Sequence, residues 1–291
     1  MRHRLMLVAV CTALSGCSGS ETGETIVANE QEVAGDLSGN SAAAAEAGAN
    51  AASDEPAICR NFKSRENDTG TLHGIAIGDT VEQVTQQLTC ISNPHTLGIT
   101  HENGVGPDVE MPSGQKGIKF VSGEQRSPLS SQYVTAHFVG VPGSERVIGV
   151  SSSGSFDDDG KPSLQQFSNS LLKQHPLARR YEPGVDGAMA NRTTIGYGSS
   201  ADGVRFSNRR ALDGCARTEM VRPQCGLSYS VQLVVNYNSN ELVTGFFATL
   251  VDWSYAIKKI AATETEVRNA TAQFNREQLK AAEKRSGPSG L

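Results

Sequence analysis

The spacing of apolar residues after Thr80 predicts a short amphipathic helix. Val81, Val84 and Leu88 recur at intervals of three and four and therefore share one helical face. Thr80 and Gln83 match the Thr-x-x-Gln capping box, in which each side chain bonds the backbone of the other residue. We expect the helix to begin here and to bury one narrow apolar face.

A second helix of the same design is predicted after Ser163. Ser163 and Gln166 match the same capping box. Apolar residues stand at the same offsets from the cap as in the first helix, namely Leu164, Phe167 and Leu171. Both helices end near a proline, Pro94 or Pro176, because proline cannot continue a helix.

Segments with the alternation of β-strands follow each helix. The alternation is clearest in 132–139, where Tyr133, Thr135 and His137 lie on one side and Val134 and Ala136 on the other. Three segments follow the first helix and three follow the second: 117–122, 132–139, 146–153, 192–197, 227–237 and 242–252.

This order predicts an α+β fold built of tandem units, in which each helix covers one face of a three-stranded antiparallel sheet. The globular domain is expected to span 57–252, with possible repeat units 57–160 and 161–252. A true duplication and a chance recurrence of amphipathic spacing both account for the pattern.

A long helix is predicted over 253–285, followed by a disordered tail at 286–291 that contains Gly287-Pro288. We expect its first turns to pack on the domain and the remainder to project into solvent. A coiled coil or a partner-binding helix is the alternative. Its apolar seam, interrupted by Glu264 and Thr271, consists of Trp253, Ile257, Ile260, Val267 and Phe274.

Residues 1–16 have the three parts of a bacterial export signal. A basic start precedes an apolar stretch from Leu5 to Leu14, which is roughly half of the ~20 residues that a spanning helix needs. The segment ends in Leu14-Ser15-Gly16-Cys17, which resembles the lipobox of bacterial lipoproteins. The resemblance implies that cleavage leaves Cys17 at the N-terminus, carrying acyl chains such as palmitate that anchor the protein in a membrane.

The residue after the anchor bears on sorting in that family. Ser18 is not the aspartate associated with retention at the inner membrane, which favours the outer membrane and a periplasm-facing protein. Residues 17–56 contain acidic residues but no Lys or Arg, with Ala, Gly, Ser and Asn between them. Such a segment is predicted to be a disordered acidic tether with a reach of ~30–40 Å.

The formal net charge of −5 owes much to this tether, so the globular part is close to neutral. Nucleic-acid binding therefore gains no support from composition.

Four cysteines remain after Cys11 in the signal and Cys17 at the anchor. An exported protein can form disulfides, and four cysteines allow three pairings. We predict Cys59–Cys90, which would fasten the start of the domain to the end of its first helix, and Cys215–Cys225, which closes a short loop. Zinc is the rival reading, but the chain has no CxxC pair.

The stretch Gly74-Ile75-Ala76-Ile77-Gly78-Asp79-Thr80, followed by Val84, Leu88 and Asn93-Pro94, resembles the opening of the small lipoprotein subunit of the outer-membrane β-barrel assembly machine. Asp79 replaces that family's methionine, and Cys90, Ile91 and Ser92 stand where a glycine is expected. Its fold, a helical layer on a small antiparallel sheet, is shared with the β-lactamase inhibitor protein, where the unit occurs in tandem. The resemblance implies a protein-binding scaffold, not an enzyme, and carries over no contact residue.

Catalytic motifs occur only as fragments. Ser170-Leu171-Leu172-Lys173 and Ser113-Gly114-Gln115-Lys116 match Ser-x-x-Lys of the penicillin-binding enzymes, without the Ser-Asp-Asn or Lys-Thr-Gly that accompanies it. Residues 149–153 lack the final glycine of Gly-x-Ser-x-Gly. The acidic run 157–160 lacks EF-hand spacing. We assign no catalytic residue.

Histidines and carboxylates gather in one Gly-rich segment, at His95, His101, Glu102, Asp108 and Glu110. They would bind a metal only if the fold made them converge, and an exposed loop is the alternative. We assign no metal and no cofactor.

These observations predict an envelope lipoprotein that acts as a protein-binding or scaffolding module in the periplasm, or binds a wall component. The competing hypotheses are an envelope hydrolase or metal-dependent enzyme with an unrecognised site, and a purely structural lipoprotein.

Overall fold

The computed structural model describes residues 57–60, 62–63, 65, 70–90, 95–102, 104–127, 130–181, 192–236 and 241–286. These all belong to the second of two units into which the chain divides, Ser53–Leu291. The predicted export signal, Cys17, the predicted tether and residues 287–291 lie outside the described residues.

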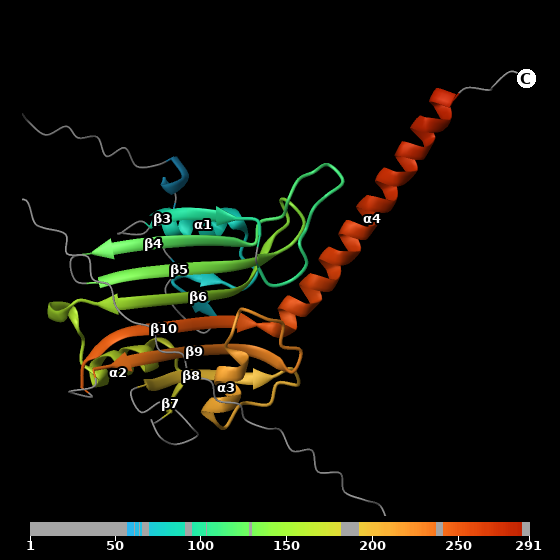
Figure 1. Ribbon diagram of the computed structural model, residues 1–291. Helices are drawn as coiled ribbons and strands as arrows, with labels where there is room; N and C mark the ends of the chain where they lie inside the picture. Colours follow the sequence, from blue (N-terminus) through green and yellow to red (C-terminus); the bar gives the residue numbers. More distant parts are fainter. Residues whose placement is uncertain are drawn as a thin grey trace, which may run out of the picture. The chain divides into compact units, whose positions relative to one another are not determined.

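The domain is built on one antiparallel sheet of eight strands in the order β3-β4-β5-β6-β10-β9-β8-β7 (Figure 1). The order shows that the two halves of the chain supply the two halves of the sheet, which meet at β6 and β10. The strands are β3 (Thr96–Thr100), β4 (Phe120–Ser127), β5 (Ser130–Val139), β6 (Arg146–Phe156), β7 (Arg179–Tyr181), β8 (Arg192–Ser200), β9 (Cys225–Val235) and β10 (Val243–Asp252).

This arrangement is α+β as predicted, but the division into three-stranded units is not confirmed. Each half contributes four strands to a single sheet. Only three were predicted in each half, because the sequence patterns did not identify the edge strands β3 and β7. β3 buries none of its residues and β7 has only three, so neither carries a readable alternation. The short helix α3 (Arg209–Cys215) and the β1–β2 hairpin (Thr71–Leu72, Ile75–Ala76) were also missed.

The predicted helices cover one face of the sheet. The helix α1 (Val81–Cys90) contacts β3 and β4, and α2 (Leu164–Gln174) contacts β8. Thr80 and Gln83 form both hydrogen bonds of the capping box, at 3.2 and 2.9 Å. The Ser163 hydroxyl accepts from the Gln166 amide at 3.2 Å. The core beneath the helices includes Val84, Leu88, Val134, Val150, Ile195, Leu233 and Leu250.

The ladder between β6 and β10 depends on glycine. Gly245 lies opposite Ser155, and a Cβ at Gly245 would come 2.7 Å from the Gly154 carbonyl oxygen. Across the same ladder, Gly154 pairs with Phe246, whose ring would lie 2.4 Å from a Cβ at Gly154. Glycine therefore allows the two halves to approach closely and the Phe246 ring to lie over the strand.

A second cluster holds α4 (Trp253–Ser286) to the end of the sheet. Trp253 is fully buried, and its indole nitrogen donates to the Cys215 carbonyl at 2.9 Å. Cys215 and Cys225 form a disulfide in the same cluster, and the other disulfide joins Cys59 to Cys90. These are the two pairs predicted from the sequence.

Beyond its first turns α4 leaves the domain, as its interrupted seam predicts (Figure 1). Trp253, Ala256 and Thr263 are buried, whereas Phe274 is 40% and Leu279 65% exposed. A single helix therefore carries apolar side chains into solvent.

Replacing Gly245 with alanine is expected to lower the free energy of unfolding by about 1–3 kcal/mol, because the new methyl group would press on backbone that cannot yield. Urea unfolding of the oxidised protein measures the change. Gly214→Ala in α3 is the matched control: a Cβ there meets nothing within 4 Å, and alanine favours a helix by roughly 0.8–1 kcal/mol over glycine. Equal effects of the two substitutions would contradict this role for Gly245.

Candidate functional site

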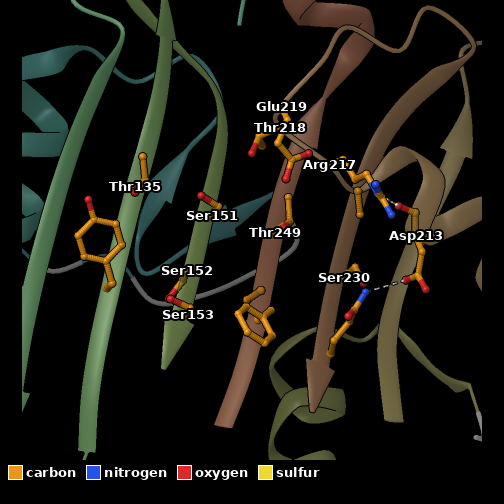
Figure 2. A pocket seen from close by; sticks show the side chains of 15 residues that line it. Thr135, Ser151, Ser152, Ser153, Asp213, Arg217, Thr218, Glu219, Ser230 and Thr249 are labelled. Carbon is orange, nitrogen blue, oxygen red and sulfur yellow. Dashed lines mark hydrogen bonds between the residues drawn. The ribbon is translucent and has the colours of Figure 1, made fainter. Parts of the chain in front are cut away.

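The middle of the sheet face opposite α1 and α2 carries a polar surface, which we call the open face. Figure 2 shows its side chains rising from β5, β6, β10 and β9 toward a cavity of about 350 Å³. The helix α3 and the loop that follows it border the cavity on one side. The open face is defined by Ser122, Tyr133, Thr135, Ser151, Ser153, Ser230, Gln232, Phe247 and Thr249.

Strand register places five hydroxyl groups in one row across the open face. Each member is the direct cross-strand partner of the next, so successive hydroxyls are separated by about one strand spacing, ~4.8 Å. The Ser230 side chain is buried, and its hydroxyl has no hydrogen-bond partner among the described residues. This row offers donors and acceptors to a ligand, and it runs Ser122, Thr135, Ser151, Thr249, Ser230.

The neighbouring row presents two aromatic rings to solvent. Tyr133 pairs with Ser153, and Ser153 pairs with Phe247. Tyr133 is 47% exposed and Phe247 is 50% exposed. Two strand spacings separate their backbones, about 9.5 Å, with only a serine between them. Among the described residues, both rings remain open to solvent.

A polar network fixes the α3 side of the cavity. The Asp213 carboxylate accepts from Arg209 at 2.9 Å and from the Gln232 amide at 3.4 Å. Arg192 donates to the Gln232 oxygen at 3.3 Å, and its guanidinium lies 5.8 Å from the centre of the Phe247 ring. The network therefore connects the helix to one of the two exposed rings.

The loop clamped by Cys215–Cys225 forms the upper border of the cavity. Thr218 packs on Gly149 of β6, where a Cβ would come 3.1 Å from its methyl group. Arg217, Thr218 and Glu219 line the cavity (Figure 2). In the same loop, Met220 is 54% exposed. The disulfide holds this mixed apolar and charged loop against the sheet.

A serine–histidine pair lies on the open face, and its geometry does not favour catalysis. The His137 Nε2 is 3.0 Å from the Ser151 hydroxyl. Its Nδ1 is buried without a partner among the described residues, so no carboxylate orients the ring. Burial lowers the pKa of His137 to about 4, which makes it a weak base at neutral pH. The edge contact between His137 and Phe120 points to a packing role.

The motifs found in the sequence do not assemble into a site. Ser170 and Lys173 are exposed on α2. Ser113 lies in a loop, where it bonds Gln115, and Lys116 pairs with Glu102 at 3.2 Å. Residues 158–160 form a 3-10 turn in which Lys161 contacts Asp158.

The predicted gathering of histidines and carboxylates is also dispersed. His95 is buried against Gly123, whereas the His101 ring contacts the Gly117 carbonyl at 3.3 Å. Asp108 instead pairs with Lys119 at 3.2 Å. Across the described ranges, no group of three or more His, Cys, Asp or Glu side chains could hold a metal ion.

Sequence reasoning identified part of the open face and missed the rest. The alternation in 132–139 already placed Tyr133 and Thr135 on one side. Phe247 gave no such signal, because apolar residues surround it in β10 on both faces. The loop after α3 was missed because only tertiary packing sets it beside β6.

No family model, curated protein or solved structure matches this chain. The resemblance to the assembly-machine lipoprotein therefore stays a prediction. In the described part of the chain, no helix has the length and apolar character needed to cross a membrane.

The stability of the domain is expected to fall as the pH drops from about 6.5 to about 4. The unfolded chain takes up a proton on His137 near its usual pKa of 6.5, whereas the folded protein resists this until about 4. The loss that His137 contributes is at most about 3.5 kcal/mol, since one pKa unit corresponds to about 1.4 kcal/mol.

Urea unfolding at neutral pH and at about pH 4.5 tests this expectation. His137→Gln keeps a group that can bond Ser151 and should show a smaller difference between the two pH values. Parallel pH profiles for the variant and the parent protein would remove His137 as a source of acid sensitivity.

Proposed function

We propose that this protein is a lipid-anchored envelope lipoprotein whose open face binds another protein. The observation that carries the proposal is the exposed pair Tyr133 and Phe247 on a sheet face that none of the described helices covers at that point. Burying two such rings would supply much of the apolar contact of a small interface.

The residue types on the open face and in its adjoining loop favour a protein partner over a wall glycan. Aromatic residues, methionine and arginine are enriched in protein interfaces. The open face has the two rings at its centre, with Met220 and Arg217 in the adjoining loop. The hydroxyl row can satisfy polar groups of the partner that become buried.

The two halves of the sheet support a repeat with four strands in each unit. We infer that units 57–160 and 161–252 are equivalent, with α1 matching α2 and β3–β6 matching β7–β10. The sheet order places matching strands at equal distances from the central β6–β10 pair. A binding surface that crosses this centre uses strands from both units.

The anchor determines where such a surface acts. The lipobox at Leu14–Cys17 supports attachment to a membrane, and Ser18 supports the outer one. The two disulfides suit an oxidising compartment. A periplasm-facing scaffold is the function that these features support best.

Cys17→Ser is expected to abolish lipid attachment, because acylation requires the thiol. Cells labelled with a palmitate analogue should then give a labelled parent protein and an unlabelled variant. Cys11→Ser is the control and should keep the label. Label that persists in Cys17→Ser would contradict the lipobox.

A photo-reactive amino acid placed at Ser153, between the two rings, is expected to form an adduct with one discrete protein in native cells. Tyr133→Ala with Phe247→Ala should reduce the adduct at least tenfold, because truncating each buried anchor costs about 2 kcal/mol or more. Electrophoresis of the purified adduct gives the yield and mass.

Ile99→Ala with Val204→Ala is the matched control. These residues are 53% and 68% exposed and do not belong to the open face, so the adduct should persist. An adduct formed only from a probe at Thr265 would assign binding to α4. An adduct that a muramidase removes would assign it to a wall glycan. Either result rejects the open face as a protein-binding surface.

A further inference from the structure

A second cavity, of about 280 Å³, lies on the opposite side of the sheet beneath α2. Its floor is formed by side chains of β9 and β10, and Phe167 and Leu171 of α2 form its roof. Nothing in the proposed function uses this cavity. It is larger than the ~150 Å³ apolar cavity that is known to accommodate benzene.

Aromatic rings make up much of the cavity wall. Phe156 contacts Phe167 edge-on, with ring centres 5.7 Å apart, and Phe246 lies 6.1 and 6.2 Å from these two rings. On the other side, His175 stacks on Tyr229 with centres 4.1 Å apart. The separations of the three phenylalanine rings fall within the range preferred by aromatic pairs, and His175 and Tyr229 stack more closely than that. A further planar ring would therefore find both faces and edges to contact.

The polar end of the cavity is held in a strained conformation. His73 is a non-glycine residue with a positive φ, 54°, in the two-residue turn between β1 and β2. Gln87 of α1 fixes this turn by donating to the His73 carbonyl at 3.1 Å. Backbone strain of this kind persists only where the surrounding structure imposes it, and it often marks a functional position.

The His73 ring keeps hydrogen-bonding capacity. The Gln132 amide nitrogen is 3.1 Å from its Nε2 and 3.3 Å from its Nδ1. A nitrogen nearly equidistant from both ring nitrogens cannot lie in line with either lone pair. Burial lowers the pKa of His73 to about 4, so the neutral imidazole can donate and accept at neutral pH.

We propose that this cavity binds a small planar aromatic molecule that carries one hydrogen-bonding substituent, such as a phenol. The ring lies among the phenylalanine side chains of β6, α2 and β10. The substituent bonds His73 and Gln132 at the polar end. This site is independent of the open face, and its ligand is independent of any protein partner.

The proposal is tested with 4-fluorophenol and the chain from residue 17 onward carrying Cys17→Ser, which needs no detergent. Fluorine NMR should show a saturable shift with a dissociation constant on the order of 0.1–1 mM, as expected for so small a ligand. Contacts between the probe and the Leu171 methyl groups should appear in nuclear Overhauser spectra.

Ser170→Trp is expected to close the cavity from the exposed side of α2 and weaken binding at least tenfold. Asn169→Trp places the same side chain on the neighbouring exposed position, which does not line the cavity, and should bind like the parent. Gln132→Leu should weaken the binding of 4-fluorophenol about tenfold and that of fluorobenzene less than twofold, because only the phenol bonds to the polar end of the cavity.

Three results would overturn the proposal. The first is the absence of a saturable shift up to the solubility of 4-fluorophenol. The second is equal affinity of the Ser170→Trp and Asn169→Trp variants for 4-fluorophenol. The third is that 1-hexanol displaces 4-fluorophenol at the same concentration as phenol does. The last result would show a site for alkyl chains instead of aromatic rings. The contacts to Leu171 locate the probe in the parent protein, so they test the site even if a variant fails to fold.

Discussion

The antiparallel pairing of β6 with β10 is the contact on which the rest of the domain depends. These strands come from opposite halves of the chain, and their ladder joins two four-stranded halves into one sheet. The approach requires Gly245, because any Cβ there would meet the Gly154 carbonyl oxygen. Without this ladder, each half would expose a long edge with unpaired backbone groups.

A sheet of this width has two large faces, and the protein uses them differently. The helices α1 and α2 cover one face and bury the main apolar cluster. Among the described elements, α3 and the first turns of α4 cover the opposite face, near its borders. The centre of this face therefore carries hydroxyl groups and two exposed rings, which suits a surface that meets a partner. The cavity beneath α2 arises where aromatic rings on the covered face do not fill the space.

The border of the open face is held by a few long-range contacts. Trp253 bonds the Cys215 carbonyl, and the disulfide from Cys215 to Cys225 closes the loop that overhangs the sheet. Asp213 joins α3 to Gln232 on β9. Residues far apart in the chain meet in this cluster. The position of the loop closed by Cys215–Cys225 is therefore coupled to that of the N-terminal end of α4.

The sequence by itself determined the elements whose signals are local. Capping boxes and apolar spacing located α1 and α2, alternation located the long strands, and the interrupted seam of α4 predicted a helix that leaves the domain. The disulfide pairs also followed from spacing. The edge strands β3 and β7 lacked such signals, because one exposes its side chains and the other is very short. Only the tertiary structure decided that two helix–strand series share one sheet and that Tyr133 and Phe247 lie two strands apart. Strand order and register arise from pairing between distant segments, and no local pattern of residues encodes that pairing.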